Sequence, residues 1–148
     1  MVVLTTPFVD ITYLGNEDTL LIRWLQLPDA AAFREAYLSA LAFVSRHRLT
    51  TNYCTDLTLI GALTKEQEHW LHLDFYPQVY KVIRKSIQAA VVFSEEHFNA
   101  IITHYQVPDS LPEQRFIDFN YFTDLAQALH WIADIKKGQG DTLLTAAP

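Results

Sequence analysis

The run Ser86–Ser94, with the sequence SIQAAVVFS, most constrains how this chain folds. It is short and almost continuously apolar, so it lacks the polar alternation of a strand with one solvated face. A run of this kind is typical of a strand that is covered on both faces. It therefore favours a layered structure in which helices pack on a sheet.

Alternating or β-rich segments predict four further strands. Two of them flank the turn signal at 15–18 and predict an antiparallel hairpin, in which Arg23 points to solvent. The predicted strands are Phe8–Leu14, Thr19–Leu27, Asn52–Gly61, Ser86–Ser94 and Arg115–Phe122.

Amphipathic segments between these strands predict four helices. The first is 28–48, opened by Pro28 and Asp29. Thr64 and Gln67 form a T-x-x-Q capping box that starts the second helix, and Pro77 kinks or restarts it. The third helix follows Ser94 and the fourth follows Thr123 or Asp124, and we expect the fourth to end at 138.

The predicted element order is β-β-α-β-α-β-α-β-α, an α/β fold with a mixed β-sheet and helices packed on it. We expect one domain over residues 1–138 and a loose C-terminal tail over 139–148. The 148 residues fit one domain, and the 50% hydrophobic content is enough for a core.

Net charge, apolar runs and cysteine content limit the partners and the location that we expect. The net charge of −6 opposes binding to nucleic acid or to an anionic membrane. The chain has no apolar run as long as a membrane span and no signal-peptide pattern, so we expect a cytoplasmic protein. The single cysteine, Cys54, lies in an apolar strand, which favours a buried structural thiol.

Three segments resemble the STAS superfamily, which includes anti-sigma-factor antagonists and stand-alone bacterial STAS-like proteins. They are the strand end Thr55–Thr58 (TDLT), the capped helix that begins at Thr64, and Tyr121–Ile132 (YFTDLAQALHWI). The resemblance implies a sheet flanked by helices and a regulatory, non-enzymatic role. A more distant similarity to lipid carriers of the phosphatidylinositol-transfer type implies an apolar ligand.

The chain departs from the family at the position of the phosphorylated serine. Anti-sigma-factor antagonists bind a kinase partner and carry a phosphorylated serine in an Asp-Ser-x-Gly motif, whereas here Asp56 is followed by Leu57 and Thr58. Thr58 and Thr64 are the nearby hydroxyl residues, so the resemblance does not carry a phosphorylation switch to this chain.

Asp56 stands where a strand leads into a helix, which leaves two roles open. It could form, with Thr58 and Thr64, an edge for a ligand or partner at the carboxyl end of the strand, where open α/β sheets place their ligands. It could instead accept backbone N–H bonds in the turn, and the chemistry of short polar residues at strand ends favours this structural role.

The segment EQEHWLH places His69 and His72 within one helical turn, a weak metal-site candidate. A zinc site needs three or four ligands, and the sequence offers no partner for these two. A solvated helix face is therefore favoured, and we expect no metal and no cofactor. The sequence also contains no glycine-rich phosphate loop.

Aromatic residues gather on the second helix: Trp70, Phe75, Tyr76 and Tyr80. They cannot all face one way, and two roles stay open. They form either a wide core-facing stripe with tyrosine tips in water, or a surface for a partner or a second copy of the chain.

Three functions follow in order of preference. The first is a non-enzymatic STAS-like regulatory or protein-interaction domain that self-associates as a homodimer or binds a protein partner. The second is a small carrier or sensor of an apolar, lipid-like ligand held between the aromatic helix and the sheet. The third is a metal-dependent enzyme that uses His69 and His72.

Overall fold

The computed structural model describes residues 1–47, 49–104 and 116–146, without the side chains of 100–104 and 138–146. The end of the predicted third helix, 105–107, and the loop predicted after it lie outside the described residues.

The described residues form one six-stranded sheet in the order β1-β2-β3-β4-β5-β6. The first three strands pair antiparallel, and β3 to β6 are parallel. This confirms the predicted α/β class with a mixed sheet and helices packed on it. The strands are β1 (Val2–Thr5), β2 (Val9–Leu14), β3 (Thr19–Trp24), β4 (Asn52–Asp56), β5 (Ile87–Val92) and β6 (Ile117–Phe122).

The predicted element order is wrong at its start, because β1 precedes the predicted hairpin. This strand has four residues, pairs with β2 and is irregular between Val2 and Leu4. A strand this short is stabilised by its neighbour rather than by its own sequence. The predicted strand 52–61 is also too long, because β4 ends at Asp56 and a turn follows.

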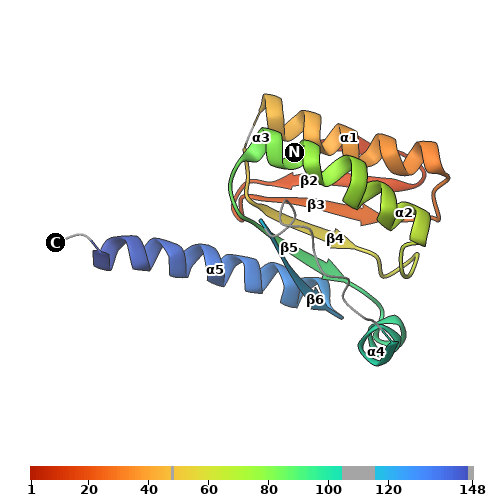
Figure 1. The fold of residues 1–148 in the computed structure, drawn as a ribbon. Helices are drawn as coiled ribbons and strands as arrows, with labels where there is room; N and C mark the ends of the chain where they lie inside the picture. Colours follow the sequence, from red (N-terminus) through yellow and green to blue (C-terminus); the bar gives the residue numbers. More distant parts are fainter. Residues whose placement is uncertain (48, 105–115, 147–148) are drawn as a thin grey trace.

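One face of the sheet is covered by α1 (Ala30–Arg46) and by a continuous run of α2 (Lys65–Trp70), η1 (Leu71–Phe75) and α3 (Tyr76–Ile83) (Figure 1). Asp29 caps α1, since its carboxylate accepts the Ala32 N–H at 2.7 Å. The turn η1 is π-helical, and Pro77 lies in the first turn of α3. The π-helical turn gives way to α-helix at Tyr76, so the predicted restart near Pro77 corresponds to a change of helix type within one continuous run, and a kink there stays a prediction.

Large rings fill the space between these helices and the sheet. Phe33 and Tyr37 of α1 lie 4.9 Å apart between ring centroids, and Trp24 of β3 stacks on Phe33 at 5.6 Å. Trp70 and Phe75 stack on each other at 5.4 Å, and both lie within 6.3 Å of Tyr37. Burial raises the pKa of the Tyr37 phenol to about 12, which is consistent with a dry core.

The opposite face is packed by α5 (Leu125–Ala146) through small side chains. Cys54, Ala90 and Ala128 are at most 1% exposed and form a second cluster with Leu21 and Ile132. The remaining helix, α4 (Glu95–His104), follows β5.

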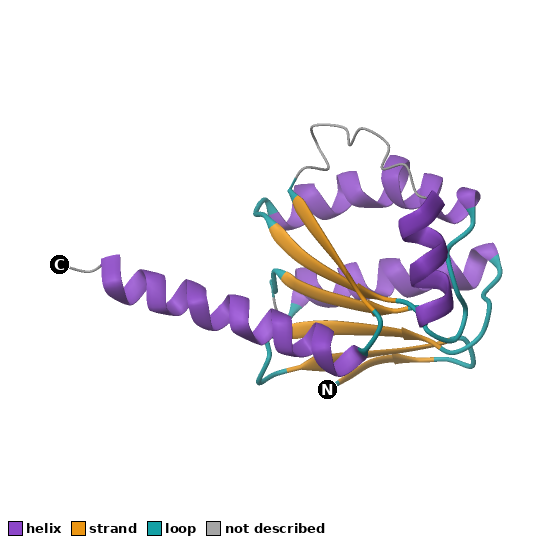
Figure 2. Cartoon of the chain, turned by 90° about the horizontal axis from the view of Figure 1, so that it is seen from below, coloured by secondary structure: helices purple, strands orange, loops and turns teal. Residues whose placement is uncertain are grey.

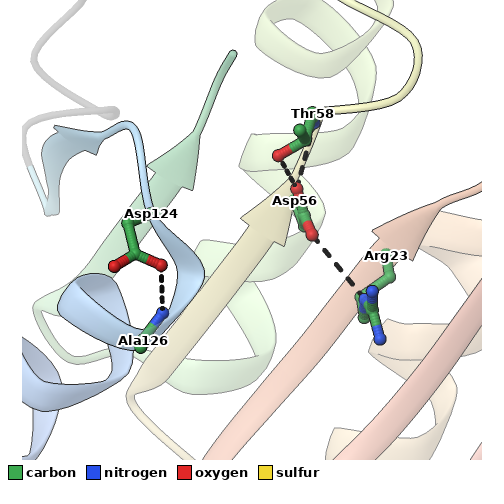
Figure 3. A network of polar contacts seen from close by, with 5 residues as sticks. All are labelled: Arg23, Asp56, Thr58, Asp124 and Ala126. Atoms are coloured by element: carbon green, nitrogen blue, oxygen red, sulfur yellow. Dashed lines mark hydrogen bonds and ion pairs between the residues drawn. The ribbon is translucent and has the colours of Figure 1, made fainter. Parts of the chain in front are cut away.

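The start of α5 agrees with the sequence, but its end does not. The carboxylate of Asp124 accepts the Ala126 N–H at 3.1 Å, so Asp124 rather than Thr123 caps the helix (Figure 3). The predicted end at Gly138 is wrong, since α5 continues to Ala146 through Gly138 and Gly140. The division into a domain at 1–138 and a loose tail at 139–148 stays a prediction.

Candidate functional site

Asp56 lies at the carboxyl end of β4, next to Arg23 on β3. The parallel register pairs these two residues, and Arg23 Nε lies 3.6 Å from Asp56 Oδ2 (Figure 3). The Asp56 side chain is 12% exposed and that of Arg23 is 49% exposed, so the carboxylate is shielded while its partner meets water. Arg23 therefore offsets the charge that the fold buries at Asp56.

The other carboxylate oxygen of Asp56 organises the turn that follows β4. Asp56 Oδ1 accepts the Thr58 backbone N–H at 3.0 Å and also accepts the Thr58 hydroxyl (Figure 3). A short acidic side chain that bonds the backbone two residues ahead is an Asx turn. The structural role predicted for Asp56 is confirmed by these contacts, and a ligand role for Asp56 and Thr58 stays a prediction.

Cys54 points to the α5 face of the same strand and is fully buried. Burial raises the pKa of its thiol from about 9 to about 12, and the negative charge of Asp56 acts in the same direction. The thiol therefore stays protonated at neutral pH, whereas a nucleophilic cysteine needs its thiolate. The predicted structural thiol agrees with this position.

A contact between the loop after β4 and the first turn of α4, at the same edge of the sheet, was not predicted. Gly61 has a φ of +79°, and a Cβ atom there would lie 2.7 Å from His97 Nε2. His97 Nδ1 lies 2.8 Å from the Ser94 hydroxyl, which also accepts the His97 N–H at 3.3 Å as the cap of α4. Gly61 was placed at the end of the predicted strand 52–61, and its contact with His97 joins a loop to helix α4, so it has no local signal in the sequence.

The Thr64 side chain caps the start of its own helix, α2. Its hydroxyl accepts the Gln67 N–H at 3.1 Å, and the Gln67 side chain accepts the Thr64 N–H at 2.9 Å. This confirms the predicted capping box, in which each residue satisfies a backbone donor of the other.

The predicted aromatic residues do not form one surface. Trp70 belongs to the ring cluster of the core, and the Arg34 guanidinium lies 5.7 Å from its ring centroid. The Tyr76 ring lies 6.1 Å from Phe119 of β6, and the Tyr80 ring lies 5.2 Å from Phe116, the residue before β6, between centroids. Trp70 and Phe75 are therefore core residues, whereas Tyr80 is 46% exposed, and a partner surface at these residues stays a prediction.

His69 and His72 do not share a metal-binding group in the part of the chain that the structure describes. His69 is exposed, whereas His72 is half-buried and packs edge-on against Tyr76 at 5.1 Å. No group of three or more His, Cys, Asp or Glu side chains suitable for a metal is found among the described residues.

In comparisons with known proteins, no family model, curated protein or solved structure matches this chain. Within the described residues, no helix is both long and apolar enough to span a bilayer.

Proposed function

We propose that this chain is a non-enzymatic regulatory or protein-interaction domain of the STAS-like type. The observation that carries the proposal is a pair of large apolar side chains on the outside of the helical layer. Leu73 of η1 is 65% exposed and Tyr80 of α3 is 46% exposed, about two helical turns further along. We name this pair the outer stripe.

The outer stripe has features of an interaction surface. Leu73 and Tyr80 bracket Tyr76 and Pro77, which are half-buried, so apolar side chains follow one line along the helix. Aromatic residues are enriched where proteins meet, because one ring buries a large area and loses few rotamers. A partner with an apolar groove or helix face fits this line of side chains.

The second candidate function, a carrier of an apolar ligand, has less support. It places its pocket between the aromatic helix and the sheet, where Trp70, Phe75 and Tyr37 pack ring against ring. A shallow hollow of about 250 Å³ does lie between β1 and α1, but Arg46 and His47 line it beside apolar groups. A carrier of this type would yield a stoichiometric small molecule on organic extraction of natively purified protein.

Affinity capture with matched variants tests the interaction function. Tagged protein is expressed in its own cells, cross-linked and recovered as the wild type, as Leu73→Glu/Tyr80→Glu, and as Leu38→Glu. Leu38 is the control because it is 42% exposed on α1 and lies outside the outer stripe.

We expect the wild type and Leu38→Glu to retain the same specific partner and the double variant to lose it. Each variant is checked by circular dichroism, so that loss of a partner is not loss of fold. The proposal is contradicted if the wild type recovers no specific partner, or if the double variant retains the one that it recovers.

A further inference from the structure

Helix α5 is longer than the sheet on which it lies. Its 22 residues span about 33 Å at 1.5 Å per residue. The six residues of β5 or β6 span only about 20 Å. Figures 1 and 2 show the consequence, since the C-terminal part of α5 extends past the edge of the sheet. We call residues 138–146 the α5 overhang.

The sheet face under α5 is only partly covered. Most contacts of α5 with the sheet are made with β4, β5 and β6. On the same face, Leu21 of β3 is buried in the α5 cluster and Leu14 of β2 packs against it. Further along these two strands, Asp10, Thr12 and Arg23 are half-buried or exposed. The described residues place no second helix there, whereas the other face carries two helical rods, α1 and the α2–α3 run.

We propose that a second copy of this chain supplies the missing helix. The α5 overhang of each copy lies beside the α5 of the other, antiparallel to it, and covers β2 and β3. Packed helices are about 8–10 Å apart and neighbouring strands about 4.8 Å apart, so a helix beside α5 is displaced by two strands. That displacement takes it from β4 and β5 to β2 and β3.

The composition of the α5 overhang favours packing against another surface. It contains Gly138 and Gly140, and glycine is among the least favourable residues inside a helix. Helices in proteins are stabilised chiefly by packing one face against other elements. Beyond the sheet edge, the described residues of the same chain offer no such surface, and a two-fold related copy offers it to both helices at once.

Charges at the sheet edge are complementary between the two copies. Because α5 follows β6 and runs back along it, α5 leaves the sheet at the edge where β3 begins. The turn before β3 carries Glu17 and Asp18. Lys136 and Lys137 are exposed where the overhang begins, so the proposed arrangement brings them to the acidic turn of the second copy.

Analytical ultracentrifugation of the full chain over a concentration series tests the proposal. The charge on the helix is reversed in Lys136→Glu/Lys137→Glu, the charge on the turn is reversed in Glu17→Lys, and a third variant combines them. The matched control is Lys81→Glu/Lys85→Glu, which makes the same net change at exposed positions in and just after α3.

We expect a wild-type dimer that each reversal weakens by about tenfold or more, as charge pairs at interfaces do, with partial recovery in the combined variant. The control should dimerise like the wild type, and a chain that ends at Lys137 should be monomeric. A monomeric wild type overturns the proposal, and so does a dimer that all reversals leave unchanged. The outer stripe lies on the other face, so its capture experiment succeeds or fails independently.

Discussion

The two faces of the sheet are packed by opposite means. On the α1 and α3 side, large rings such as Trp24 and Phe33 interlock, and each is at most 1% exposed. On the α5 side, Cys54, Ala90 and Ala128 bring the helix close to the strands by their small size. The first face is therefore packed by large side chains and the second by small ones, and α5 covers only part of the second face.

Removing a ring from the first face should have the largest effect. Phe33→Ala deletes a side chain that contacts Trp24, Tyr37 and Trp70, and we expect a loss of about 3–5 kcal/mol in the free energy of unfolding. Phe122→Ala, at a half-buried ring under α5, should cost clearly less. Urea denaturation of both variants measures the difference, and equal losses would contradict the contrast between the faces.

Alkaline pH should act on the ring-packed face through Tyr37. Its pKa is raised by burial from about 10 to about 12, so the neutral phenol is favoured in the folded state. The resulting stability is complete below pH 10 and is lost as the pH rises toward 12, which amounts to about 3 kcal/mol at most.

The measurement is urea denaturation between pH 8 and pH 11.5 for the wild type and Tyr37→Phe. We expect a shallower decline in the variant above pH 10. Part of the decline should remain, because burial also raises the pKa of Tyr53. Identical profiles for the two proteins would show that Tyr37 ionises in contact with water.

A larger side chain between α5 and the sheet should lower the free energy of unfolding. Ala128 is fully buried between α5 and the sheet, and Ala128→Leu should cost about 1–3 kcal/mol by pushing the helix outward. Ala126→Leu makes the same change at an exposed position two residues earlier and should be nearly neutral. If Ala128→Leu were tolerated equally well, α5 would not be held closely to the sheet.

The sequence predicts what local patterns determine. The parallel strand β5, the capping box at Thr64, the restart near Pro77 and the turn role of Asp56 all follow from residues close together in the chain. The hydrogen bonds of the capping box and of the Asp56 turn join residues two or three positions apart, so the residue types alone indicate them. The same holds for the cap of α5 at Asp124.

The features that were missed depend on distant neighbours. Strand β1 exists because β2 pairs with it, and Gly61 is restricted by His97 of helix α4. Helix α5 continues through Gly138, where local propensity predicts an end. The end of β4 was missed for a local reason, because an apolar run continues past Asp56 although the Asp56–Thr58 bond marks a turn there.

The smallest effects should come from the polar pair at the boundary between the covered and open parts of the α5 face. Arg23→Ala should cost at most about 1 kcal/mol, because the guanidinium is half exposed and 3.6 Å from the carboxylate. Asp56→Ala should cost about 1–2 kcal/mol, since it also removes both bonds to Thr58. Asp56→Asn keeps an acceptor for the turn and should fall between them.

The sign of the Asp56→Asn effect separates the two roles of this residue. A turn organiser loses stability on substitution, whereas a binding residue held in an unfavourable place commonly gains it. The melting temperatures of Arg23→Ala, Asp56→Asn and Asp56→Ala, measured under one condition, therefore distinguish a turn role of Asp56 from a binding role. A rise in melting temperature for Asp56→Asn would favour a ligand at this edge of the sheet, since the turn alone predicts a fall.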